Sequence, residues 1–255
     1  MRRARRNENV DLKLGKLKPR LDKRTIRLKD VLRAELLPPL PDSFDVDSSL
    51  GGITDNNIYG NDALADCVIA GRAHMTLRFE DFEQRKIIPI TNADVEGEYF
   101  KETGGKDSGL TMLDSLNCWR RGWRAAGETY DIYAYASFDC SNHDESKYAI
   151  VLLRGAYIGI QLPQSAMTQF QNGQEWDVID ADGGILGGHC VYVLAFDQDS
   201  VTCVTWGKRQ LMTWAFWDKY CDEAYGIVQD KEHFVTDSPV DVNRLDDYLT
   251  AISER

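Results

Sequence analysis

The sequence has no long apolar run. Its longest apolar stretches, such as 148–153 and 190–196, are far too short to cross a bilayer, and no charged-then-apolar leader opens the chain. We therefore expect no signal peptide, no transmembrane segment and no membrane partner. A location in the cytoplasm or in a virion fits this expectation.

Closely spaced cysteine pairs are also absent. The six cysteines are Cys67, Cys118, Cys140, Cys190, Cys203 and Cys221, and none has CxxC or metal-ligand spacing. Zinc or another metal is not expected, nor is any cofactor. Reduced thiols are the default in a chain without a leader, and most of these cysteines are expected to be small core residues.

Charge is unevenly distributed along the chain. Residues 1–33 hold 13 Lys or Arg against 4 Asp or Glu, a balance of +9, so the total of −11 leaves −20 for the remainder. Nucleic-acid contact is one interpretation of Arg2, Arg3, Arg5 and Arg6, but the acidic body would repel phosphates. Docking of this basic arm on an acidic surface, of its own chain or of a neighbour, is at least as good a prediction. A homo-oligomer or larger assembly stays open.

Three segments are expected. A proline cluster at 36–41 cannot continue a helix and separates a basic arm and linker (1–40) from a domain over 41–235, and a tail with a short helix follows at 236–255. In the tail, Leu245, Leu249 and Ile252 have helical spacing.

Helices are expected before strands. Apolar spacing and caps predict helices over 67–82, 92–101, 111–121 and 146–153, the first capped by Asp66. Strand formers predict β elements near 130–135, 156–162, 190–196, 201–206 and 226–229. This order indicates an α+β domain with two lobes, and the 43% hydrophobic content is enough for its core.

Cys67 and His189 are the residues most suited to chemistry. A thiol at a helix start is expected to have a lowered pKa, because the positive end of the helix favours the thiolate. His189 follows Gly187-Gly188 and opens an apolar strand, where a ring can be aimed with little obstruction. Alone the pair is weak evidence, since an inert buried cysteine and a structural histidine are commoner than a catalytic pair.

Five ordered motifs strengthen the interpretation. They are Leu40-Pro41-Asp42-Ser43-Phe44-Asp45, Asn61 six residues before Cys67, Gly155 to Ile160, Gly187-Gly188-His189-Cys190-Val191 with Ala195-Phe196-Asp197, and Val204-Thr205-Trp206-Gly207. Over about 40–228 the chain resembles the papain-like cysteine peptidases. It is also similar to bacterial and phage proteins that share Gly-Asn-Asp-x-x-x-Asp-Cys, Gly-Gly-His and Thr-Trp-Gly.

The resemblance implies a papain-like two-lobed fold, with an N-terminal helical lobe and a C-terminal antiparallel, β-barrel-like lobe. It also implies roles: Cys67 attacks a carbonyl, His189 moves the proton, and Asn61 donates to the oxyanion beside the N–H of Cys67. Gly188 and Trp206 would lie at the substrate. Asn61 as a simple turn residue, and Trp206 as a core aromatic, are equally compatible with the sequence.

The departures from the family pattern fall around the histidine. The Asn that orients the imidazole in the family aligns with Val204, which cannot form a side-chain hydrogen bond. Thr205 is the nearest polar substitute, although a shift of one residue turns a strand side chain to the other face. Without an orienting group the pair could still work, but more slowly or on an easier bond.

Three functions remain open. The first is a thiol-dependent peptidase or amidase acting on a peptide or protein, with the arm and linker as a propeptide-like cover or a simple clasp. The second is a papain-fold structural or binding protein that lost catalysis, such as a phage virion or assembly component. The third, acyl or glutamyl transfer, uses the same nucleophile.

Overall fold

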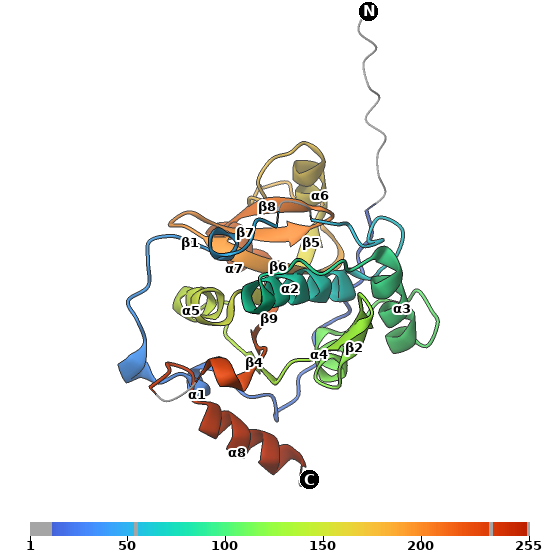
Figure 1. Cartoon of the computed structure of the whole chain (residues 1–255). Helices are drawn as coiled ribbons and strands as arrows, with labels where there is room; N and C mark the ends of the chain where they lie inside the picture. Colours follow the sequence, from blue (N-terminus) through green and yellow to red (C-terminus); the bar gives the residue numbers. More distant parts are fainter. Residues whose placement is uncertain (1–11, 54–55, 235–236, 254–255) are drawn as a thin grey trace, which may run out of the picture.

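The computed structural model describes residues 12–53, 56–234 and 237–253 (Figure 1). Arg2, Arg3, Arg5 and Arg6 therefore lie outside the described residues, as does the side chain of Ile252.

A seven-stranded antiparallel sheet organises the described chain. Across it the strands run β4 (Ala134–Ser137), β9 (Cys221–Val228), β5 (Ala156–Pro163), β6 (Ile185–Phe196), β7 (Ser200–Thr205) and β8 (Lys208–Thr213), and the short β1 (Phe44–Asp45) also pairs with β6. No pairing of β4 with β8 closes a barrel among these strands. Strand β5 is buried almost throughout and β6 is buried from His189 onward, as expected for a sheet covered by helices on its faces, whereas β6 starts with the exposed Ile185 and Leu186.

The helical lobe comes first in the chain. It contains α2 (Cys67–Gln84), α3 (Asn92–Thr103), α4 (Met112–Trp119) and the hairpin of β2 (Trp123–Ala125) and β3 (Glu128–Tyr130). Side-chain oxygens fix two starts: Thr91 and Asp94 form a capping box at α3, and Thr111 accepts from Asp114 N–H at α4. The helix α2 packs against β6, and this contact joins the helical lobe to the sheet.

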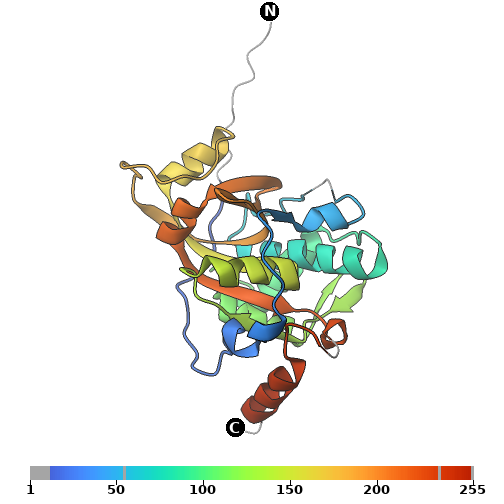
Figure 2. The ribbon, with the colours of Figure 1, turned by 90° about the vertical axis from the view of Figure 1, so that its left-hand side faces the viewer.

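Further helices flank the sheet and the ends of the chain. They are α1 (Leu28–Val31), α5 (His143–Leu153), α6 (Gln164–Gln171), α7 (Trp214–Tyr220) and α8 (Val242–Ser253), with 3-10 turns at Ala34–Leu36, Val46–Ser49 and Lys231–His233. In two perpendicular views α6 lies at one end of the molecule and α8 at the other (Figures 1 and 2). None of the helices in the described part of the chain is both long and apolar enough to span a bilayer.

The predicted α+β class is confirmed, with differences in detail. The hairpin β2–β3, the helices α6 and α7 and the strand β8 were not expected. Strand β6 begins at Ile185, so His189 lies inside the strand instead of opening it, because the glycines at 187 and 188 are extended and paired with β5. Asp66 precedes α2 as predicted, but its side chain makes no cap hydrogen bond.

The core draws on residues from both sides of the predicted domain limits. Ile26, Leu28 and Val31 from the arm, and Val240 and Leu245 from the tail, are buried in the same cluster as the sheet. The limits at 40 and 235 stay predictions.

Candidate active site

Cys67 is the first residue of α2 and is almost fully enclosed, with 1% of its surface exposed. Hydrogen bonds from the backbone of Cys190 and of Gly15 favour its thiolate, but burial outweighs them and raises the pKa of Cys67 to about 11. The expectation of a lowered pKa was therefore wrong for this state of the chain. Cys67 does lie at the start of a helix, but burial destabilises its thiolate more than the positive end of the helix stabilises it.

His189 lies on β6, opposite Ile160 of β5 and one residue before Cys190. Its Nε2 is 2.6 Å from Thr205 Oγ1. Its Nδ1 is buried and has no hydrogen-bond partner within the described residues, Cys67 included. Burial lowers the pKa of His189 to about 3, so the imidazole is neutral at physiological pH.

Trp206 covers the imidazole of His189. The two rings are stacked, with centroids 4.2 Å apart and planes 14° apart. Trp206 and Gly207 form the tight turn between β7 and β8, both with positive φ (43° and 74°), as in the hairpin turns that match strand twist. This turn presents Thr205 at the edge of the ring and Trp206 on its face, although the two residues are adjacent in sequence.

Asn61 is buried in the loop before α2, where its Nδ2 donates to the carbonyl of Leu64 at 3.0 Å. The side-chain amide of Asn61 also hydrogen-bonds to the carboxyl of Asp66, which by itself would lower the pKa of that carboxyl. Close by, burial raises the pKa of Asp66 to about 8, and this carboxyl is largely protonated at neutral pH.

The arm itself lies between the helical lobe and the sheet, and we call the space that it fills the groove. Lys16 N–H donates to the carbonyl of Gly188 at 3.0 Å, on the sheet side, and Leu17 N–H donates to the carbonyl of Leu110 at 2.9 Å, on the helical side. Leu110 N–H returns a bond of 2.9 Å to Gly15. We call residues 13–17 the covering segment.

Two more hydrogen bonds hold the start of the covering segment. Lys13 N–H donates to the carbonyl of Asn61 at 3.1 Å, and Trp206 Nε1 donates to the carbonyl of Lys13 at 3.3 Å. Three of the predicted site residues, Asn61, Gly188 and Trp206, thus contact the chain's own backbone.

Glycines allow this close approach. A Cβ on Gly188 would lie 2.2 Å from the carbonyl oxygen of Lys16, one on Gly109 would lie 2.3 Å from that of Gly15, and one on Gly15 would lie 1.8 Å from that of Ala65. Real Cβ atoms essentially never come so near, so each of these positions accepts only a glycine while the segment is in place.

The remaining histidines fit structural roles. His74 is buried against Tyr59, with ring centroids 4.9 Å apart, and its pKa is lowered by burial to about 3. His143, the first residue of α5, stacks on Trp214, the first residue of α7. Within the described ranges, no group of three or more His, Cys, Asp or Glu is arranged to hold a metal ion.

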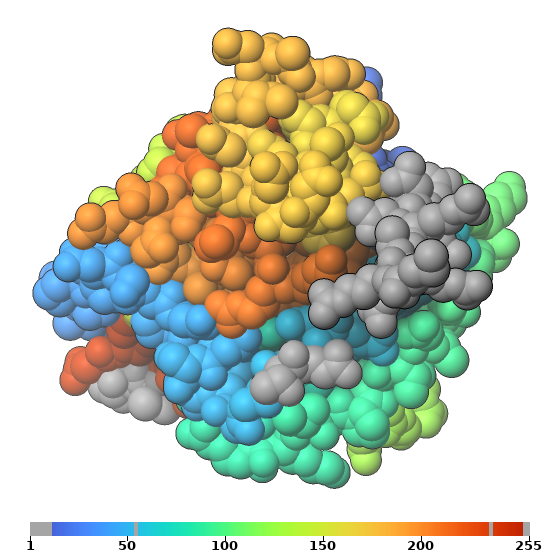
Figure 3. Space-filling view, turned by 90° about the horizontal axis from the view of Figure 1, so that it is seen from above, coloured from blue at the N-terminus to red at the C-terminus, as the bar shows by residue number. Residues whose placement is uncertain are grey.

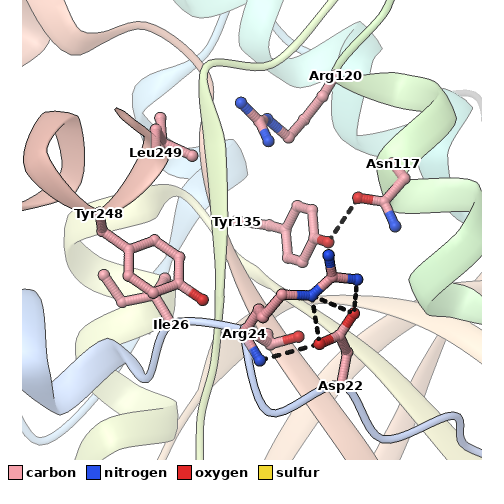
Figure 4. A pocket seen from close by; sticks show the side chains of 9 residues that line it. Asp22, Arg24, Ile26, Asn117, Arg120, Tyr135, Tyr248 and Leu249 are labelled. Carbon is pink, nitrogen blue, oxygen red and sulfur yellow. Dashed lines mark hydrogen bonds and ion pairs between the residues drawn. The ribbon is translucent and has the colours of Figure 1, made fainter. Parts of the chain in front are cut away.

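A separate small pocket, with a volume of about 130 Å³, lies among the arm, α4, β4 and α8 (Figure 4). Arg24 and Asp22 form an ion pair of 2.6 Å at its edge, and Tyr135 donates to Asn117 Oδ1 at 2.8 Å. Neither Cys67 nor His189 lines it. Seen from above, the gold residues of α6 lie beside the orange residues of β7 and β8, and the orange residues border blue residues that precede α2 (Figure 3).

Comparison of the sequence with known protein families finds no match, and comparison with curated proteins finds none. Solved structures do match. Xylellain, a cysteine protease from Xylella fastidiosa, aligns with a TM-score of 0.70 at 12% identity, over 86% of this chain and 97% of that one. The proCathepsin B S9 of Trypanosoma congolense gives 0.59 at 13% identity, over 88% and 89%. The cysteine protease and lectin-like domains of Cwp84 from Clostridium difficile give 0.61 at 12% identity, over 84% and 55%. The chain has the papain-like fold, as its motifs predicted.

Sequence reasoning missed the acidic residues that meet the covering segment. The Nζ of Lys16 lies 2.9 Å from Asp222 Oδ1 and 3.1 Å from Glu223 Oε1. The only available signal was two adjacent acids at the start of a strand, which is common on exposed strand ends.

Proposed function

We propose that this chain is a thiol-dependent peptidase or amide hydrolase in which Cys67 is the nucleophile and His189 the base. The observation that carries the proposal is the covering segment: an extended peptide backbone lies in the groove, bonded to both walls, beside the Cys67 sulfur. A groove that binds a backbone in this way suits a peptide substrate.

Each side chain has a role in this proposal. The unpartnered Nδ1 of His189 takes the thiol proton and later delivers it to the leaving amine. Thr205 holds Nε2 and so orients the ring, in the place of an asparagine. The side-chain amide of Asn61 and the backbone N–H of Cys67 stabilise the oxyanion, and for this the amide exchanges one of its present partners, Leu64 or Asp66. Trp206 keeps water from the imidazole.

The covering segment would keep this machinery in a resting state. Enclosure makes both Cys67 and His189 neutral, so there is no thiolate–imidazolium pair while the segment is in place. Removing the segment would return water to both groups, lowering the pKa of the thiol and raising that of the imidazole.

A catalytically silent papain-fold binding or structural protein is the second candidate. The enclosure of Cys67 and the hydroxyl at Thr205 instead of an amide favour it. The two candidates differ in what happens once the groove is opened.

The test uses the full chain with Lys16→Glu, which sets a carboxylate against Asp222 and Glu223 and should expel the covering segment. We expect Cys67 in this variant to react with iodoacetamide at pH 6 much faster than the other five thiols, and casein to be hydrolysed. Adding His189→Ala should abolish both effects. Lys18→Glu, an exposed control with the same charge change, should resemble the parent chain.

If opened Cys67 labels no faster than the other thiols and casein stays intact, the hydrolase proposal is wrong and the silent scaffold stands. Rapid labelling without hydrolysis of casein would contradict a peptidase acting on general protein substrates.

A further inference from the structure

A buried acidic pocket receives the side chain of Lys16. The side chain is 0% exposed, and its Nζ contacts both carboxylates: Asp222 at 2.9 and 3.0 Å and Glu223 at 3.1 Å. The backbone of the same residue is the part of the covering segment that pairs with Gly188. The pocket is therefore entered from the groove.

The carboxylates of this pocket are held in place by other residues. Gln161 donates to Asp222 Oδ2, and Tyr225 donates to Glu223 Oε2 at 3.1 Å. The facing oxygens, Asp222 Oδ1 and Glu223 Oε1, are buried and accept no hydrogen bond from the described chain apart from their ion pairs with Lys16. In the described chain, the ammonium of Lys16 is therefore the partner of both oxygens.

Charge in the pocket favours a cation strongly. Burial alone would lower the pKa of Lys16, but the carboxylates of Glu223 and Asp222 outweigh it, and the pKa is raised. Burial is also the main reason why the pKa of Glu223 is raised. One ammonium thus faces two carboxyl groups in this pocket.

The shape of the pocket suits an unbranched side chain. Gly159 of β5 forms its wall, and a Cβ there would lie 1.9 Å from Lys16 Cε. The missing side chain leaves a channel for methylenes that ends at the two acids. Lysine fills it with its ammonium already at contact distance, while a guanidinium would need more room.

We propose that this pocket is the specificity site for a basic side chain, lysine above all, of the peptide that the groove binds. Lys16 occupies it as the chain's own ligand. The proposal rests on the proposed function for the nature of the ligand, but its physical content is selective binding, which needs no catalysis.

The experiment measures binding in the full chain carrying Cys67→Ala and Lys16→Glu. The probes are a fluorescent peptide with the sequence of residues 12–18 and the same peptide with norleucine at the position of Lys16, which keeps the methylenes and removes the charge. We expect the norleucine peptide to bind at least about tenfold more weakly, about 1.4 kcal/mol. A glutamate at this position should abolish binding.

Two double variants test the acids. Asp222→Asn with Glu223→Gln should remove the preference for lysine over norleucine. Asp144→Asn with Glu232→Gln, which makes the same charge change at exposed positions, should leave the preference intact. A second measurement adds no peptide and keeps Cys67. Amide hydrogen exchange of residues 12–18 should be faster in Lys16→Met than in the parent chain, and the exchange rate in Lys18→Met should equal that of the parent.

Equal affinity for the lysine and norleucine peptides, or no binding of the lysine peptide, would overturn the proposal, as would unchanged exchange in Lys16→Met. These results would leave hydrolysis by Cys67 untouched. Conversely, if the chain binds the lysine peptide selectively but hydrolyses nothing, the proposed lysine pocket is supported and the proposed peptidase function is wrong.

Discussion

At the scale of single residues, the hydroxyl of Thr205 decides how well His189 is aimed. A threonine hydroxyl can donate or accept, so it can hold Nε2–H and leave Nδ1 free to take a proton. It can also donate to Nε2 and leave the proton on Nδ1, the less useful tautomer. Thr205 therefore permits both tautomers, whereas an asparagine carbonyl, which only accepts, would permit one.

We expect Thr205→Val to lower kcat about tenfold, the equivalent of a net hydrogen bond of about 1–1.5 kcal/mol. Thr205→Ser should keep most of the activity because it keeps the hydroxyl. Both are measured with Lys16→Glu present, so that the groove is open. An unchanged kcat in Thr205→Val would show that Trp206 alone positions the ring.

The carboxyl of Asp66 gives a pH dependence next to the nucleophile. Its pKa is raised to about 8 by burial, above an unfolded value near 3.8. The folded chain thus holds this proton more tightly, so the stability from Asp66 is complete below pH 3.8 and is lost as pH rises through 8. His74 and His189, with pKa values lowered to about 3, act oppositely, but only below about pH 6.5.

Between pH 6.5 and 8 the contribution of Asp66 should therefore decline by about 2 kcal/mol, at about 1.4 kcal/mol per pH unit. Asp66→Asn should remove this decline relative to the parent chain, as measured by urea unfolding at both pH values. Identical pH slopes in the two chains would mean that the carboxylate is already solvated or paired in the folded state.

The sequence predicted the residues around His189 better than those around Lys16. Gly188 immediately precedes His189 on β6, and Trp206 follows Thr205 in the turn from β7 to β8, so short sequence motifs contain these residues. Lys16 and Asp222 are 206 positions apart and meet only because β9 pairs with β5 and the arm enters the groove. No local pattern encodes such a meeting.

At the scale of elements, glycines make the groove fit the covering segment. We expect Gly188→Ala to push the segment away, because its Cβ would overlap the Lys16 carbonyl oxygen. Limited proteolysis should then cut within residues 12–18 much sooner than in the parent. Gly97→Ala on α3, where a Cβ meets nothing within 4 Å, is the matched control. Equal cutting rates in all three chains would contradict the close contact at Gly188.

Long elements with strong signals were predictable, and short ones were not. The helix from Cys67 and the strands around 156–162 and 190–196 could be predicted because they are long and rich in apolar residues. In contrast, α6 begins after Pro163 without a side-chain cap, and β8 is half exposed with the polar start Lys208-Arg209-Gln210. Contacts with neighbouring strands and helices determine the structure of α6 and β8. A local sequence pattern carries no information about such contacts.

At the scale of the whole molecule, the tail shares its core with the arm. The backbone of Leu32 pairs with that of Val240, and Arg33 forms an ion pair of 3.1 Å with Asp241. Leu245 of α8 is fully buried. These contacts link the arm to the tail, and the covering segment lies further toward the N-terminus of the same arm.

If the tail belongs to the same cooperative unit, Leu245→Ala should lower the free energy of unfolding by about 2–5 kcal/mol, as for other buried leucines. Leu21→Ala, at a position 95% exposed, should change it by less than about 0.5 kcal/mol. Urea unfolding followed by tryptophan fluorescence, which reports α4, the β2–β3 hairpin, the β7–β8 turn and α7, should then show one transition shifted to lower urea for Leu245→Ala. If α8 instead unfolds on its own, this fluorescence transition will stay where it is in the parent, and the arm will be anchored by the groove and α1 alone.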